Sequence, residues 1–83
     1  MKIPGAILDM HGREMYRVVA YQGCPFDWSG YFTAPARGVF ATDVDYWFRS
    51  LGGRESKIRP TTVEAFGPNA KLIRFHAFGS LGE

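Results

Sequence analysis

The prediction of the fold depends most on one stretch, Ala41-Thr42-Asp43-Val44-Asp45-Tyr46-Trp47-Phe48-Arg49-Ser50-Leu51-Gly52. Its apolar residues recur at intervals of three and four, which would place them in one stripe along a helix: Val44, Trp47, Phe48 and Leu51. Thr42 stands where an N-cap belongs, because its hydroxyl can accept from the free amides of a first turn. Gly52 can adopt the left-handed conformation that ends a helix. The stretch therefore predicts an amphipathic helix over residues 41–52.

The chain before this stretch is typical of antiparallel strands. Residues 6–10 and 13–21 predict the two arms of a hairpin with His11 and Gly12 at the turn, because Gly readily takes a positive φ. Both faces of the second arm are mostly apolar, which is typical of a strand that is covered on both sides. Residues 30–34 predict a further short strand.

The chain after the stretch continues with a polar segment over residues 52–59, which we expect to be a loop. Residues 61–66 and 70–78 predict a second hairpin, with its turn at Gly67-Pro68-Asn69. Residues 79–83 are expected to form a loose C-terminal tail.

The length and composition indicate one domain over residues 1–83. A chain this short needs a core dense in large side chains, and aromatic residues make up 16% of the sequence. We predict an α+β fold, in which one amphipathic helix packs on a four- to five-stranded, mainly antiparallel sheet. The alternative is a small open β-barrel with one helix.

The sequence contains a single cysteine, Cys24, which excludes an intramolecular disulfide framework and a cysteine-rich zinc site. Small secreted domains usually contain disulfides, so we expect a reducing compartment, the cytoplasm. The first residues do not have the pattern of a signal peptide, and no apolar run is long enough to span a membrane. No spacing of His, Cys and carboxylates suggests a metal site, and no cofactor is expected.

The segment over residues 21–32 has five aromatic residues, although it breaks the pattern of a strand at Gly23 and Pro25. Aromatic residues on such a segment can anchor a partner protein at low entropic cost. We predict a non-enzymatic binding module that acts through protein–protein contact, with five contact residues: Tyr21, Phe26, Trp28, Tyr31 and Phe32. Alternatively, Phe26 and Trp28 fold back over the core.

A homodimer is the expected form of the protein, because the thirteen aromatic residues exceed what one helix on one small sheet can cover. An unidentified protein is the next expected partner. In either case the aromatic surplus would be covered by a second chain.

The net charge of +2 keeps nucleic acid possible as a different partner. The densest basic stretch covers residues 54–59, and further arginines stand on the predicted strands. A single-stranded nucleic-acid surface would use five residues: Arg17, Arg54, Lys57, Arg59 and Arg74.

A third possibility is a small-ligand-binding protein or an enzyme with a pocket near Cys24 and His76, between the helix and the sheet. Cys24 would then be a nucleophile and a histidine its base. A lone cysteine is most often a small buried apolar residue. We therefore expect no catalytic residue.

Overall fold

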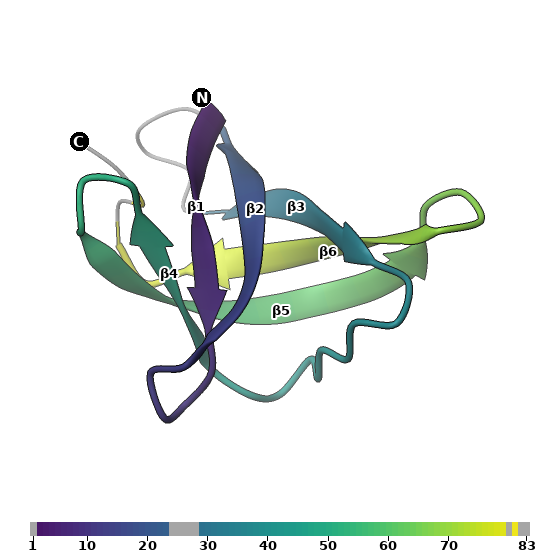
Figure 1. Cartoon of the computed structure of the whole chain (residues 1–83), viewed down its shortest axis with the longest axis horizontal. Coiled ribbons are helices and arrows are strands. Elements are labelled where there is room, and N and C mark those ends of the chain that lie inside the picture. Colours follow the sequence, from purple (N-terminus) through teal and green to yellow (C-terminus); the bar gives the residue numbers. More distant parts are fainter. Residues whose placement is uncertain (1, 24–28, 80, 82–83) are drawn as a thin grey trace.

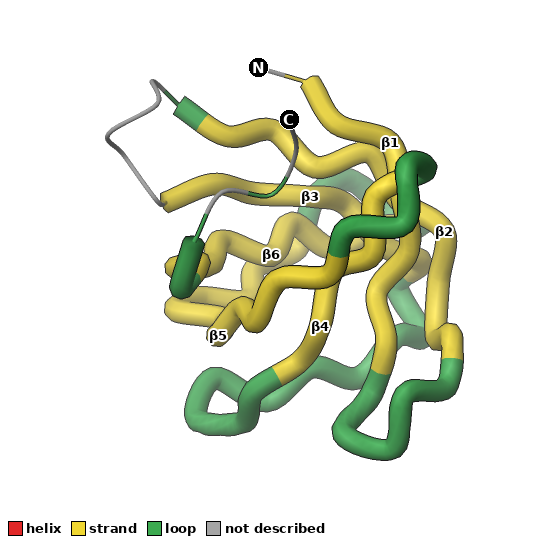
Figure 2. The backbone as a smooth tube through the Cα atoms, turned by 90° about the vertical axis from the view of Figure 1, so that its left-hand side faces the viewer, coloured by secondary structure: helices red, strands yellow, loops and turns green. Residues whose placement is uncertain are grey.

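The computed structural model describes residues 2–23, 29–79 and 81, and its regular elements are six β-strands. No part of the described chain is helical, as Figure 2 shows. The strands are β1 (Lys2–Leu8), β2 (Glu14–Gln22), β3 (Ser29–Pro35), β4 (Tyr46–Ser50), β5 (Glu55–Ala65) and β6 (Ala70–Ala77).

The six strands form a closed antiparallel barrel in the order β1-β2-β3-β6-β5-β4 (Figure 1). The first three strands follow one another as neighbours, and a long connection over residues 36–45 then carries the chain to β4, which pairs with β1 and closes the barrel. A strand that returns beside the first of three consecutive strands makes a Greek key. Segments far apart in the sequence therefore meet along the β1–β4 and β3–β6 pairs.

The core lies inside the barrel, because alternate side chains of each strand point inward. Its largest fully buried rings are Phe32, Phe48 and Phe75, one each from β3, β4 and β6. The connection over residues 36–45 adds Phe40, whose ring centroid lies 5.4 Å from that of Phe32 and 5.5 Å from that of Tyr46. This connection is thus part of the packed interior.

The predicted helix over residues 41–52 is wrong, since residues 46–50 of this stretch form β4. Adjacent residues lie on opposite faces of the strand: Phe48 is fully buried, and Trp47 faces outward and is half-buried. Tyr46-Trp47-Phe48 is rich in the aromatic residues that strands favour. Pairing with β1 on one side and β5 on the other satisfies the backbone of β4, whereas a lone short helix is only marginally stable.

The α+β fold class is consequently wrong as well, because the described chain has six strands and no helix. The alternative is correct in naming a small barrel, although this barrel is closed and the described residues supply no helix to it.

The predicted loop over residues 52–59 is wrong from Glu55 onward, where β5 begins. The segment looked like a loop because of its charges, yet these alternate with inward-facing residues. Ile58 is buried, and Lys57 and Arg59 lie on the outer side, where they meet an acidic partner next to β4. Charged residues at every second position are compatible with a strand that is half-exposed.

Both predicted hairpins are confirmed: β1 pairs with β2, and β5 pairs with β6. Their turns contain Gly12 and Gly67, which have φ values of 80° and 77°. The carboxylate of Asp9 accepts hydrogen bonds from the amides of His11 and Arg13 at 2.8 and 2.9 Å, which stabilises the first turn and lowers the pKa of Asp9. The predicted short strand is also present, as β3.

The expected loose tail includes Leu81, whose side chain is fully buried with the core residues. Residues 80, 82 and 83 lie outside the described part of the chain. For these residues the loose tail stays a prediction.

Candidate functional site

Two of the predicted contact residues, Tyr21 and Tyr31, form a stacked pair on the outer surface. They are register partners between β2 and β3, their ring centroids lie 5.0 Å apart, and the planes are inclined by 15°. Tyr21 is 37% exposed and Tyr31 is 39% exposed. The pair is a rigid aromatic surface that is already assembled in the free chain.

Gly30 lets the two strands approach each other at this point. A Cβ atom at position 30 would collide with the carbonyl oxygen of Tyr21 and would lie 2.8 Å from Cζ of Phe75. Any other residue would therefore push β3 away from β2 and separate the two tyrosine rings. The position of Tyr31 depends on the glycine that precedes it.

Three grooves adjoin the tyrosine pair, with volumes of about 570, 530 and 320 Å³. Tyr21 lines the first two and Tyr31 lines the first and third. We define the tyrosine surface as this pair together with four exposed residues from the lining of the second and third grooves: Val19, Thr33, Leu51 and Phe66. Most of this surface is apolar or aromatic.

Among the described residues that line these three grooves, the charged side chains are Arg17 and Arg74. Nε of Arg17 lies 3.4 Å from Glu14, and Nε of Arg74 lies 3.2 Å from Glu64. The side chains of the two arginines are 82% and 54% exposed. Ion pairs this exposed are weak, so both guanidinium groups can also meet an external carboxylate.

The other predicted contact residues are not part of this surface as the structure describes it. Phe32 is fully buried and faces the core, where its ring lies 5.9 Å from that of Phe75. Its side chain is therefore not accessible to a partner. Phe26 and Trp28 fall outside the described residues, as does Cys24.

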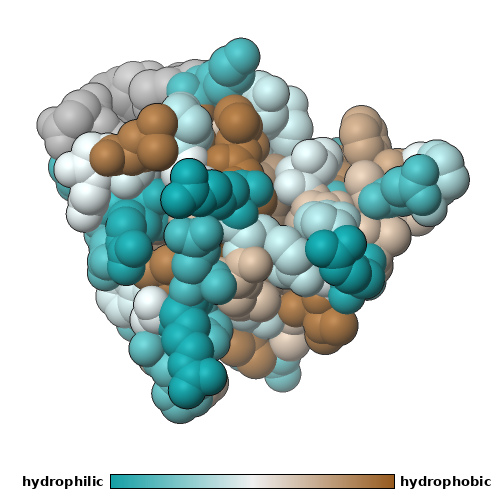
Figure 3. Space-filling view, in the orientation of Figure 1, coloured by the Kyte–Doolittle hydropathy of each residue, from teal (hydrophilic) through white to brown (hydrophobic). Residues whose placement is uncertain are grey.

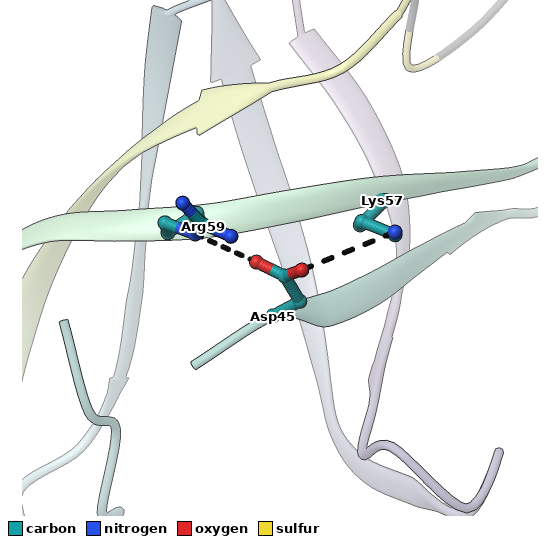
Figure 4. A network of polar contacts seen from close by, with 3 residues as sticks. All are labelled: Asp45, Lys57 and Arg59. Atoms are coloured by element: carbon teal, nitrogen blue, oxygen red, sulfur yellow. Dashed lines mark hydrogen bonds and ion pairs between the residues drawn. The ribbon is translucent and has the colours of Figure 1, made fainter. Parts of the chain in front are cut away.

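The predicted basic residues are distributed over several parts of the barrel. Arg17 and Arg74 flank the tyrosine surface, and Arg54 lies between β4 and β5. Lys57 and Arg59 lie on β5, where both point toward Asp45 (Figure 4). The five residues do not form one continuous basic stripe.

Asp45 lies directly before β4 and links this strand to β5. Nε of Arg59 lies 2.7 Å from one carboxylate oxygen, and Nζ of Lys57 lies 3.9 Å from the other. The hydrogen bond from Arg59 favours the ionised carboxylate, so the pKa of Asp45 is lowered and the pKa of Arg59 is raised.

Phe78 follows β6 beside this ion pair and is 56% exposed. Cζ of Arg59 lies 5.5 Å from the centre of its ring, Nζ of Lys57 lies 6.0 Å from it, and the ring of His76 meets it edge-on at 5.7 Å. Lys57 also lies 5.6 Å from the ring of Trp47. We call these five residues the Phe78 surface, a second place where cations and aromatic rings meet.

The pocket expected near Cys24 and His76 would have required a helix beside the sheet, which the described chain lacks. His76 instead lies on the outer side of β6, exposed. Within the described ranges no group of three or more His, Cys, Asp and Glu is placed to hold a metal ion. The same ranges contain no helix that is long and apolar enough to cross a membrane.

Sequence reasoning missed Val19, Thr33, Leu51 and Phe66 as parts of a surface around the tyrosines. The signal for Val19 was its alternation with Tyr21 in the second arm of the first hairpin. Leu51 was assigned to the predicted helix stripe, and nothing local in the sequence places it near β2. Comparison of the chain with protein-family models, with curated proteins and with solved structures found no match.

Proposed function

We propose that the protein is a small non-enzymatic binding module that contacts a partner protein through the tyrosine surface. The observation that carries this proposal is the stacked pair of Tyr21 and Tyr31, which is exposed and adjoins three grooves. Tyrosine gives a large contact area at a low cost in side-chain entropy, and stacking restricts these two rings before a partner arrives.

A partner of different sequence is favoured over a second copy of the chain. The expectation of a homodimer came from more aromatic residues than a single helix and sheet could cover. The closed barrel takes five of these rings into its buried interior: Phe32, Phe40, Tyr46, Phe48 and Phe75. The surplus that required a dimer is thereby much reduced. A cytoplasmic location is part of the proposal, supported by the single cysteine.

The test is a comparison of captured proteins between Tyr31→Ala and Val39→Ala, each immobilised and exposed to the same nuclease-treated cell extract. Val39 is 77% exposed and lines none of the three grooves, so its loss controls for removing an exposed apolar side chain. We expect a protein retained by the original chain and by Val39→Ala to be lost with Tyr31→Ala.

Phe66→Ala is a second test variant, because Phe66 is 56% exposed in the turn after β5 and its removal leaves the barrel core intact. Circular dichroism would show that each variant keeps its strands. The proposal is wrong if folded Tyr31→Ala and Phe66→Ala retain the same proteins as the original chain.

Single-stranded nucleic acid is the second candidate partner, supported by the Phe78 surface, where Lys57, Arg59 and His76 surround an exposed ring. Such rings can stack on bases while cations meet phosphates. The measurement is the fluorescence anisotropy of a labelled thymidine oligonucleotide at several salt concentrations. Binding should weaken with a log–log slope of about −0.7 per neutralised phosphate, and Arg59→Gln should reduce it. Salt-independent binding, or no binding, would remove this candidate.

A further inference from the structure

The barrel wall is incompletely paired between β2 and β3. Across this seam the register comprises two pairs, Tyr21↔Tyr31 and Gln22↔Gly30. Beyond them the strands diverge, as Figure 1 shows, while β2 stays paired with β1 and β3 stays paired with β6. The seam therefore has two strand edges that face each other without a continuous ladder.

On the β2 side, the backbone of Val19 points into this seam. Val19 lies opposite Pro4, which has no N–H to donate, and the carbonyl of Pro4 accepts from the amide of Leu51 at 3.3 Å, on the other side of β1. The two residues thus form a non-hydrogen-bonded pair, in which the polar backbone groups of both point away from the partner strand. The N–H and C=O of Val19 are consequently directed toward β3.

On the β3 side, the backbone of Thr33 points into the same seam. Pro35 lies opposite Ala70 and has no N–H, and the carbonyl of Ala70 accepts from the amide of Phe66 at 3.0 Å, on the other side of β6. The pair of Pro35 and Ala70 is therefore not hydrogen-bonded. Thr33 stands two residues earlier in an uninterrupted register, so it has the same orientation, with its N–H and C=O directed toward β2.

Val19 and Thr33 would be the next pair after Tyr21↔Tyr31, yet the register of the described strands ends before them. Both line the groove of about 530 Å³, together with Tyr21, Leu51 and Arg17. Exposed edges with unpaired donors and acceptors can receive another strand. Phe40 is buried and packs against Tyr16 of β2 and Phe32 of β3, so the core between these two strands is filled.

The charges beside the seam indicate the chemistry of an occupant. In the described lining of the three grooves, both charged side chains are arginines, Arg17 and Arg74. An extended segment that places carboxylates beside them would form charge-assisted hydrogen bonds, and its apolar residues would meet Tyr21 and Leu51. The β2 edge of a second copy would bring Arg17 together with its partner Glu14, so it would offer the two arginines no carboxylate in excess.

We propose that an extended acidic segment of a partner protein adds to the edge of β2 at Val19, with its carboxylates toward Arg17 and Arg74. Main-chain hydrogen bonds would supply affinity, and the alternating side chains would supply specificity. This inference rests on the proposed function, because the same tyrosine surface borders the groove.

The test uses the full chain, labelled with ¹⁵N, and three synthetic peptides observed by NMR. The first peptide alternates glutamate and valine, the second has lysine in place of glutamate, and the third is the first with alternate backbone amides methylated. Without peptide, the amides of Val19 and Thr33 should exchange with solvent about tenfold or more faster than those of Val18 and Phe32.

With the glutamate peptide, the Val19 and Thr33 signals should shift and their amides should become protected. The lysine peptide should bind about tenfold or more weakly, and the methylated peptide should not protect these amides. Arg17→Gln should weaken binding of the glutamate peptide about 2- to 5-fold. Arg37→Gln, which removes an exposed charge outside the three grooves, should leave it unchanged.

The inference is overturned if the glutamate peptide leaves Val19 and Thr33 unmoved, or if the lysine or methylated peptide binds equally well. Signals of Val19 that change with protein concentration in the absence of peptide would identify a second copy as the occupant, which also overturns it. If the peptides fail while Tyr31→Ala still abolishes capture, strand addition is wrong and the proposed function stands. If folded Tyr31→Ala and Phe66→Ala both capture the same proteins as the original chain, the proposed function itself fails.

Discussion

Asp45 shows how one side chain can link two strands that local sequence does not pair. Its carboxylate lies between Arg59 at 2.7 Å and Lys57 at 3.9 Å, both from β5, while Asp45 itself precedes β4 (Figure 4). In the sequence, this carboxylate falls within the predicted helix over residues 41–52, and the two cations fall within the predicted loop over residues 52–59. The ion pairs instead run across neighbouring strands, where opposite charges stabilise a sheet.

We expect Asp45→Asn to lower stability at neutral pH but to matter less in acid. The hydrogen bond from Arg59 lowers the pKa of Asp45 in the folded state, so the unfolded chain binds this proton more readily. The contribution is therefore fully present above the unfolded Asp pKa of about 3.9 and is lost as pH falls through the lower, folded value.

The measurement is the urea midpoint of the original chain and of Asp45→Asn at neutral and at strongly acidic pH. The difference between the two should shrink as pH falls below about 4. Asp43→Asn removes the same charge two residues earlier and keeps the ion pair of Asp45 with Arg59, so it serves as the control. A difference that stays constant over this pH range would show that the ion pair does not stabilise the fold.

At the scale of secondary structure, β4 shows how a short apolar run can satisfy two patterns. The helical stripe through positions 44, 47, 48 and 51 requires Trp47 and Phe48 to lie on one face, whereas a strand puts them on opposite faces. In the barrel Phe48 is fully buried, and Trp47 is half-buried beside Lys57. Replacing Trp47 and Phe48 one at a time therefore distinguishes a helix from a strand by experiment.

We expect Phe48→Ala to destabilise the protein by about 3–5 kcal/mol, the usual cost of a buried Phe-to-Ala change. Trp47→Ala should cost less than half as much, because its side chain is on the outer face and leaves no enclosed cavity. Chemical denaturation of both variants measures the free energies of unfolding. Equal, large losses from both would indicate a shared buried face, as in a helix, and would contradict the strand.

At the scale of the whole molecule, closure of the barrel depends on the pairing of β1 with β4. A Cβ atom at Gly5 would collide with the carbonyl oxygen of Arg49 and would lie 2.6 Å from the ring of Phe48. This glycine allows the first and fourth strands to come together. Closure buries the core side chains, although some strand edges stay without a ladder partner in the described chain, among them the β2–β3 seam and the side of β5 that faces β4 beyond Ile58.

We expect the isolated chain to be a monomer of 9.3 kDa by light scattering over a wide range of protein concentrations. Five of the aromatic rings are buried inside the barrel, and Figure 3 shows separate hydrophobic areas among hydrophilic ones rather than one continuous patch on the face in view. Stable dimers usually cover a larger apolar patch. A concentration-independent mass of twice this value would contradict the expectation and would support a homodimer instead.

The sequence by itself determined the parts of this protein that depend on neighbours along the chain. Both hairpins and the strand β3 were predicted, because turn residues such as Gly12 and Gly67 and alternating apolar residues act over a few positions. Tyr21 and Tyr31 are both among the contact residues that the composition of residues 21–32 predicts, and their contact with a partner stays a prediction.

The tertiary structure decided what residues 41–52 become and where the predicted site residues lie. Backbone groups of β4 are satisfied by β1 and β5, which are distant along the chain, so no local pattern could rank strand above helix. The same holds for the seam at Val19 and Thr33, which exists because two strands part after a short ladder. Phe32 and Tyr31 are adjacent in sequence, yet the closed barrel buries Phe32 and leaves Tyr31 exposed. The alternation of side chains along a strand does not by itself show which face is buried, because that depends on how the strands close around the core.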